Sequence, residues 1–294
     1  MTRPDIVVSN MEHLIGILDL EKIEENLFRG IGPNVGWQRV FGGLVISQAL
    51  VAAQRTVVAD RFVHSLHSYF LRPGDPAVPI LYEVERIRDG ASFTTRRVVA
   101  IQHGKPIFTL SASFQVDEPG FVHQSNMPDV PAPETLDDPA TVAEKFLQGA
   151  PEHVKRYWLR ERPFEMRPVS MTHYVSDEPL PALQHVWVRP NGRFPGDRAL
   201  QSAFLAYLSD MTLLDTSLFP HGRSVFDRSL QVASLDHSMW FHSAETVDDW
   251  FLYTQDSPFG GGARGLSRGT IFSRSGRIIA SMAQEGLIRN RAND

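Results

Sequence analysis

The sequence predicts an α+β protein built from two similar halves. The block His-Ser-Tyr-Phe-Leu at residues 67–71 returns as His-Ser-Met-Trp-Phe at residues 237–241, and turn residues and extended runs follow both blocks in the same order. A repeat that spans about half of the chain indicates two fused copies of one fold rather than a solenoid. Each half also contains one stretch that is apolar on most sides, which is typical of a buried helix. We therefore expect two curved antiparallel sheets, each wrapped around one long helix.

In the first half, a short amphipathic helix is predicted over residues 11–26, and a buried helix over residues 44–58. Strand-like runs separated by turn residues follow, at residues 63–71, 79–88, 93–102 and 106–116. Residues 118–139 contain five prolines and little periodicity, which indicates a linker. A short helix is expected near residues 139–149.

The second half begins with an extended run at residues 184–189. Pro195 and Gly196 predict a turn, and Asp197 is a suitable N-cap for a helix over residues 198–214 that is again mostly apolar. Strands are expected in the remainder. The predicted domains are an N-terminal domain (1–118), a proline-rich linker with a short helix (119–160) and a C-terminal domain (161–294).

Charge and composition exclude several classes of function. The net charge of -5 leaves no basic stripe for nucleic acid. The chain has no cysteine, which excludes disulfides, cysteine-ligated zinc and a cysteine nucleophile. Neither an apolar leader nor a membrane span is evident, so we expect a cytoplasmic protein without membrane insertion.

Asp210 is the most unusual residue of the sequence. On its predicted helix the neighbours three and four positions away are Ala206, Tyr207, Leu213 and Leu214, none of which is basic. An unpaired buried carboxylate is costly or shifts its pKa upward, and such groups are frequent at functional sites. A functional role is the favoured interpretation. The alternative is a carboxylate near the helix end that is partly solvated.

Ser234, His237 and Gln284 are further candidates on predicted strands. Alternation along residues 230–242 places Ser234 and His237 on opposite faces, so a dyad between them is not expected. His237 by itself is interpreted as a hydrogen-bonded core histidine. Gln284 shares its face with Met282, and a buried amide needs partners for both its carbonyl and its NH2. The alternative for Gln284 is a polar residue on an edge strand.

Three other patterns are weak indications of a functional site. Residues 260–265 fit a dinucleotide-binding glycine pattern, but a strand follows where a helix is required. Residues 265–269 fit the Gly-x-Ser-x-Gly elbow around Ser267, again with a strand after it. The histidine pairs His64/His67 and His237/His242 lie on opposite strand faces, so no metal site is expected.

Several long motifs resemble the bacterial acyl-CoA thioesterase II family, and the resemblance extends over nearly the whole chain. They lie at residues 20–25, 40–43, 63–75, 235–242 and 284–286. The resemblance implies a double hot-dog fold, which agrees with the expected helices and sheets. It also implies three catalytic groups, which fall on Asp210, Ser234 and Gln284. The family commonly has Thr where this chain has Ser234, so the hydroxyl is kept but its rotamer is less fixed.

The implied activity is hydrolysis of fatty acyl-CoA to fatty acid and CoA, without a cofactor or an acyl-enzyme. Asp210 would activate a water that Ser234 and Gln284 orient, and backbone N–H groups at a buried-helix N-terminus would hold the oxyanion. An apolar tunnel between the two helices would take the acyl chain, and arginines at its mouth the CoA phosphates. Acyl-CoA is the expected partner, and the family implies a homo-oligomer.

Three alternatives remain open at this point. They are a non-catalytic acyl-CoA-binding protein of the same fold, a serine hydrolase that uses Ser267, and a hydratase with a hot-dog fold. The repeat itself favours a site in the second half. The buried helix of the first half has no carboxylate, and the position in the first half that corresponds to Ser234 is His64.

Overall fold

The computed structural model describes residues 8–33, 39–148, 152–194, 197–244, 246 and 248–291. The first half consists of two helices and six strands: α1 (Met11–Leu18), β1 (Glu21–Glu24), β2 (Leu27–Gly30), α2 (Gly42–Gln54), β3 (Arg61–Phe70), β4 (Ile80–Asp89), β5 (Phe93–Gln102) and β6 (Lys105–Val116). The predicted turn at Pro195 and Gly196 lies outside the described residues.

The second half begins with short helices and continues with strands around a longer helix. Its elements are α3 (Pro139–Phe146), α4 (Glu152–Leu159), β7 (Phe164–Pro168), α5 (Thr172–Val175), β8 (Leu183–Pro190), α6 (Arg198–Ser209), β9 (Leu230–Ser234), β10 (Asp236–Phe241), β11 (Phe251–Gly261), β12 (Arg264–Ser273) and β13 (Ile278–Asn290). Turns of 3₁₀ helix occur at Pro133–Thr135, Leu213–Ser217 and Phe219–His221.

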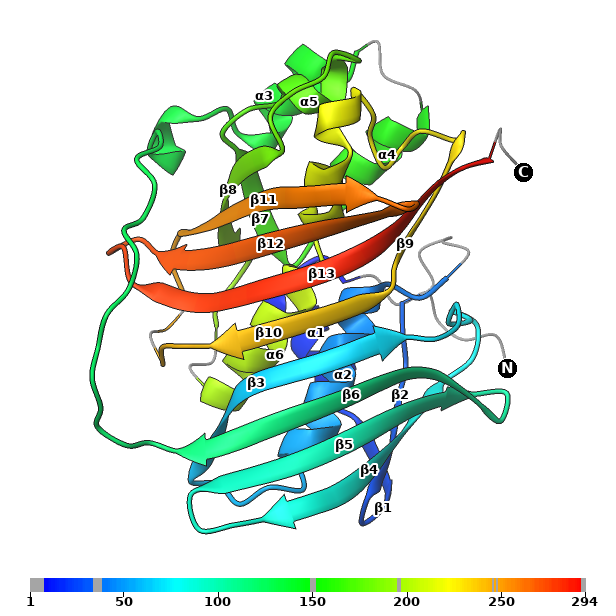
Figure 1. The fold of residues 1–294 in the computed structure, drawn as a ribbon, viewed down its shortest axis with the longest axis vertical. Helices are drawn as coiled ribbons and strands as arrows, with labels where there is room; N and C mark the ends of the chain where they lie inside the picture. Colours follow the sequence, from blue (N-terminus) through cyan, green and yellow to red (C-terminus); the bar gives the residue numbers. More distant parts are fainter. Residues whose placement is uncertain are drawn as a thin grey trace.

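The 13 strands in the described part of the chain belong to one antiparallel sheet that runs through both halves (Figure 1). The strand order is β1-β2-β4-β5-β6-β3-β10-β13-β12-β11-β8-β7, and β9 pairs with β13. The two predicted sheets are therefore joined edge to edge through β3 and β10. The prediction of an α+β fold is confirmed.

Helices α2 and α6 lie against one face of this sheet and contact each other (Figure 1). Every residue of α2 from Gly43 to Ala53 is buried, as its apolar sequence predicts. Asp197 caps α6 as expected, because its side chain accepts a hydrogen bond from the N–H of Leu200 at 2.9 Å. A single apolar cluster includes side chains from both helices and both halves of the sheet. None of the described helices is long and apolar enough to cross a membrane.

The repeated His-Ser blocks meet where the two halves join, but they are not equivalent there. Strands β3 and β10 pair with Ser68 opposite His237 and His67 opposite Ser238. Adjacent residues of a strand face opposite sides, so His237 points into the core while His67 lies exposed on the outer face. The two histidines that the sequence repeat matches therefore lie on opposite faces of the sheet.

Three helix predictions need correction. The helix predicted over residues 44–58 begins at Gly42 and ends at Gln54. The helix predicted over residues 11–26 ends at Leu18, and the chain continues as the hairpin of β1 and β2. Tertiary pairing overrides local propensity here, because the hairpin buries Phe28 at 2% exposure. The helix predicted to Leu214 ends at Ser209, since Thr212 has a left-handed φ of 60° that a helix cannot continue.

Candidate active site

The candidate site lies where the C-terminal end of α6 meets the N-terminal end of α2. Asp210 follows the last residue of α6 directly and is half-buried. Its Oδ2 accepts a hydrogen bond from the backbone N–H of Gly43 at 2.9 Å. A carboxylate at a helix N-terminus is favoured both by this free N–H and by the helix dipole.

Two glycines permit this close approach of the helix ends. A Cβ on Gly42 would lie 2.7 Å from Asp210 Oδ2, and a Cβ on Gly43 would lie 2.3 Å from the carbonyl oxygen of Tyr207. Both distances are shorter than real carbon contacts. Gly42 and Gly43 are therefore required for packing against the end of α6.

The structure brings the three predicted site residues together. Ser234 Oγ donates to Asp210 Oδ1 at 3.3 Å, and Gln284 Nε2 donates to Ser234 Oγ at 2.9 Å. Gln284 is 1% exposed and lies on β13, which has neighbours on both sides. The interpretation of Gln284 as an edge-strand residue is therefore wrong.

The predicted separation of Ser234 and His237 onto opposite faces is also wrong. Residues 230–242 are not one strand, because Leu235 separates β9 from β10 and shifts the alternation. As a result Gln284 contacts both residues, with its Nε2 on Ser234 and its Oε1 2.5 Å from His237 Nδ1. The side chain of Asp236 accepts the N–H of Glu285 at 2.7 Å beside this break. An aspartate within a strand pattern is the signal that could have predicted the interruption.

Burial controls the charge of Asp210. It raises the pKa of this carboxyl to about 6, against the opposing effect of hydrogen bonds from Gln284, Gly43 and Ser234. At neutral pH the group is therefore mainly a carboxylate, yet more basic than an exposed aspartate. This combination suits a general base.

A buried carboxyl, Asp215, is not among the residues predicted from the sequence. It follows Asp210 by little more than one turn, and burial raises its pKa to about 7. Tyr174 donates its hydroxyl proton to Asp215 Oδ2 at 2.9 Å. Its acidic side chain inside an apolar segment is the same kind of signal that identified Asp210.

Three neighbouring cavities lie near the site, and Ser234 lines two of them. Asp210, Ser234 and Gln284 line a cavity of about 200 Å³. It shares Phe41 and Arg160 with a second cavity of about 440 Å³. A third cavity of about 240 Å³ also borders Ser234 and is mainly apolar, with walls that include Val45, Phe70, Ile107 and Phe108.

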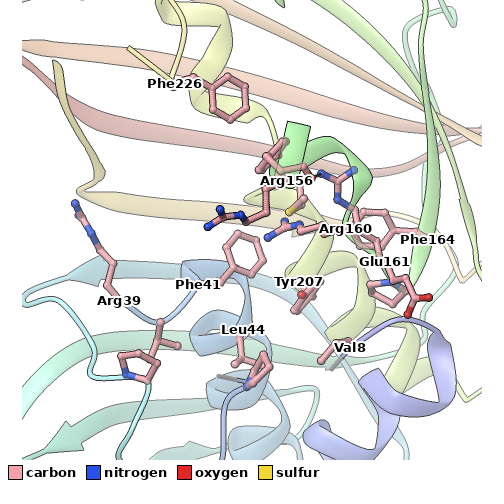
Figure 2. Close-up of a pocket in the computed structure, with 17 residues that line it drawn as sticks. Val8, Arg39, Phe41, Leu44, Arg156, Arg160, Glu161, Phe164, Tyr207 and Phe226 are labelled. Atoms are coloured by element: carbon pink, nitrogen blue, oxygen red, sulfur yellow. Dashed lines mark hydrogen bonds between the residues drawn. The ribbon is translucent and has the colours of Figure 1, made fainter. Parts of the chain in front are cut away.

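The 440 Å³ cavity combines apolar walls with a cluster of arginines. Figure 2 shows Arg39, Arg156 and Arg160 around the ring of Phe41, with Leu44 and Tyr207 nearby. Arg162 also lines it, and Glu161 is the acidic residue of the lining. The cavity is thus positively charged although the whole chain is negative.

Comparison with known proteins identifies the family. The model for the N-terminal domain of acyl-CoA thioesterase matches residues 33–115, and the model for acyl-CoA thioesterase matches residues 154–287. Acyl-CoA thioesterase 2 of Haemophilus influenzae is 43% identical over 95% of this chain and 98% of its own. Human acyl-coenzyme A thioesterase 8 is 44% identical over 93% of this chain and 88% of its own. The chain belongs to the acyl-CoA thioesterase family.

Solved structures agree with this assignment. The acyl-CoA thioesterase II TesB2 from Mycobacterium marinum is 42% identical, and it superimposes with a TM-score of 0.78 over 95% of this chain and 98% of its own. A protein from Alicyclobacillus acidocaldarius described as having a hot dog fold is 20% identical, with a TM-score of 0.72 and coverage of 93% of this chain and 96% of its own. The hot-dog fold implied by the motifs is confirmed.

The two competing motifs do not form sites in this acyl-CoA thioesterase. Ser267 is fully buried within β12, where the hydroxyls of Thr216 and Ser217 lie 3.1 Å and 3.4 Å from its Oγ. It therefore lacks the exposed strand-to-helix turn of a nucleophile elbow. Gly262 and Ala263 form the tight turn between β11 and β12, with φ of 58° and 57°.

Proposed function

We propose that the chain hydrolyses fatty acyl-CoA to a free fatty acid and CoA, by direct attack of a water molecule. Asp210 accepts a proton from this water, while Ser234 and Gln284 fix its direction. One observation carries the proposal: a continuous hydrogen-bonded series from Gln284 through Ser234 to a carboxylate with raised pKa, at the wall of a cavity.

The chemistry of a thioester suits a site with a base and no strong acid. A thiol with a pKa of about 8.5 leaves as the thiolate with little help from a proton donor. What the reaction requires is an oriented, partly deprotonated water and donors for the oxyanion. Asp210 satisfies the first requirement without forming an acyl-enzyme.

For the oxyanion we propose the N-terminal end of α2. The first N–H groups of a helix have no partner within the helix, and the helix dipole favours negative charge there. Gly43 directs its N–H to Asp210, so the donor we propose is the N–H of Gly42, the first residue of α2. The carbonyl oxygen would then lie beside the base that activates the water.

The three cavities suggest where each part of the substrate binds. The arginine-lined cavity suits the CoA phosphates, since guanidinium groups bind phosphate strongly. The 240 Å³ cavity beyond Ser234 suits the acyl chain, because Val45, Phe70 and Phe108 supply apolar walls. The thioester would then lie between them, at Asp210.

Release of free thiol from a series of acyl-CoAs tests this function. The substitution Asp210→Asn keeps the shape of the side chain but removes the base, so kcat should fall by roughly 10²- to 10⁴-fold. An Asn variant with unchanged kcat would remove Asp210 from the mechanism. Tight binding of acyl-CoA by the wild-type protein without thiol release would instead support the non-catalytic binding protein.

A further inference from the structure

We infer that His237 is a positioning residue that sets the orientation of the Gln284 amide. Its Nδ1–H holds the carbonyl oxygen of Gln284, so that the amide NH2 is directed at Ser234 and Asp210. This inference rests on the proposed function, because it assigns a role relative to the proposed base.

The hydrogen-bond partners determine which way the amide points. The carboxylate of Asp210 only accepts, and Ser234 donates its single hydroxyl proton to it at 3.3 Å. The oxygen of Ser234 therefore needs a donor, which is the NH2 of Gln284 at 2.9 Å. The carbonyl oxygen of Gln284 must then face His237, whose Nδ1 lies 2.5 Å away.

The protonation of His237 follows from the same reasoning. The Gln284 carbonyl oxygen cannot donate, so Nδ1 must carry the proton. Burial lowers the pKa of His237 to about 4, so the ring is neutral at physiological pH and its Nε2 is an acceptor. Nε2 lies 2.8 Å from the hydroxyl of Ser209, which also lies 2.9 Å from the carbonyl oxygen of Ala206. The single proton of this hydroxyl can be donated to only one of the two, and a ring protonated on Nδ1 requires it at Nε2.

The result is one chain of hydrogen bonds in which each group donates to the next, and its first and last members are adjacent in the sequence. It runs from Ser209 to His237, then to Gln284, Ser234 and Asp210. Ser209 is the last residue of α6 and Asp210 follows it. The orientation of the amide is thus set by the same helix end that carries the base.

Without the Nδ1–H, only the contacts with Ser234 and Asp210 favour this orientation of the amide. A half turn would place the carbonyl oxygen against Ser234, whose proton would then be drawn away from Asp210. The Gln284 amide also lowers the pKa of Asp210, more than Gly43 or Ser234 does. Loss of its orientation should therefore both misdirect the water and raise the pKa of the base.

Three substitutions of His237 distinguish the role of the Nδ1–H donor from that of side-chain packing. Asn places a donor near the position of Nδ1, Gln places a polar atom near Nε2 only, and Leu retains bulk without either. We expect His237→Leu and His237→Gln to lower kcat by roughly ten- to a hundredfold with little change in KM. His237→Asn should stay within about threefold of the wild type.

The pH profile of kcat/KM provides a second readout. Its acidic limb should move to higher pH in His237→Leu and remain in place in His237→Asn. The other charged or titratable groups near Asp210 come from several elements and are common to all variants: Tyr157, Arg160, Tyr207, Asp215 and Tyr253.

Two kinetic outcomes would overturn the inference. One is full activity in His237→Leu, and the other is an equal loss in the Leu and Asn variants, which would indicate packing alone. If the variants fail to fold, ¹⁵N NMR of the wild-type imidazole decides, because a neutral ring protonated on Nε2 contradicts the assigned donor. The proposed function fails separately, through an active Asp210→Asn.

Discussion

At the residue scale, the site depends on a carboxylate whose pKa is raised by burial and lowered by hydrogen bonds. Burial raises the pKa of Asp210, while the Gln284 amide and the hydrogen bonds from Gly43 and Ser234 lower it, so the carboxylate form is accessible near pH 7. Ser234 completes this arrangement with a hydroxyl alone, without the β-branch that Thr would supply.

The pKa of Asp210 predicts the acidic limb of the activity profile. Because the carboxylate is the active form and its pKa is about 6, kcat/KM should be constant above this value. It should fall about tenfold per pH unit well below it. Steady-state rates from about 1.5 pH units below this pKa to about 2 units above it, roughly pH 4.5 to 8, measure this limb.

Asp215 offers a matched control for this profile. Its pKa is also raised, and it lines the same cavity, but the proposed mechanism does not use it. Asp215→Asn should keep the limb near pH 6. If this variant lost the acidic limb, the titrating group would be Asp215 and not Asp210.

Arg156 tests the proposed CoA side of the substrate. It lines the positively charged cavity and is exposed, so Arg156→Ala should disturb the fold little. A lost charge-assisted contact to phosphate should raise KM for acyl-CoA roughly tenfold. The KM for the matching acyl-pantetheine, which lacks the nucleotide, should be unchanged. Equal effects on both substrates would contradict this assignment.

At the element scale, the site depends on two irregularities of the backbone. One is the pair of glycines at the start of α2, and the other is the interruption at Leu235 between β9 and β10. The first lets two helix ends meet, and the second turns Ser234 toward the same amide as His237. Neither helix nor strand periodicity predicts such features, because each is a local departure from it.

Gly43→Ala should damage both stability and catalysis. The new methyl group would lie 2.3 Å from the Tyr207 carbonyl oxygen, so the ends of α2 and α6 must separate. We expect a loss of about 1–3 kcal/mol in unfolding free energy and a lower kcat, since the Gly43 bond to Asp210 weakens as well. Denaturant unfolding and thiol release measure the two effects.

Gly16→Ala is the control for this substitution. Gly16 lies in α1, where a Cβ would have no atom within 4 Å. The same chemical change should therefore stabilise the protein by roughly 0.5–1 kcal/mol and leave kcat unaltered. Loss of activity in this variant would mean that α1 influences the site.

At the scale of the whole molecule, the sequence predicts the parts of the fold better than their assembly. The strands at 63–71, 79–88, 93–102 and 106–116 correspond to β3 to β6 within two residues, because turn residues separate them. The pairing of β3 with β10 has no local signal, since it joins edges from distant parts of the chain.

The same distinction applies to the site. Asp210 is predictable because a carboxylate on an apolar helix is anomalous, and Gln284 because an amide lies on a buried strand face. The link through His237 is not predictable, because it depends on the strand interruption. The domain boundaries at residues 118 and 160, the cytoplasmic location and self-association stay predictions.

A continuous sheet predicts that the halves unfold together. Leu66 and Met239 are both fully buried at the β3–β10 junction, and α2 contacts α6. We expect one cooperative transition in urea, with circular dichroism and tryptophan fluorescence giving the same midpoint. Most of the tryptophans, Trp158, Trp187, Trp240 and Trp250, lie in the second half, so independent halves would give different midpoints.

The exposed stretch at residues 117–126 is a position at which the chain could be divided into two fragments. It is the covalent passage from the first half to the second, and it runs along the outside of the molecule (Figure 1). The second half carries Asp210, Ser234 and Gln284, while the first supplies the glycines of α2. Two fragments divided in this stretch would each hold part of the site, so turnover would report their reassembly. The chain is thus a natural candidate for a fragment-complementation sensor.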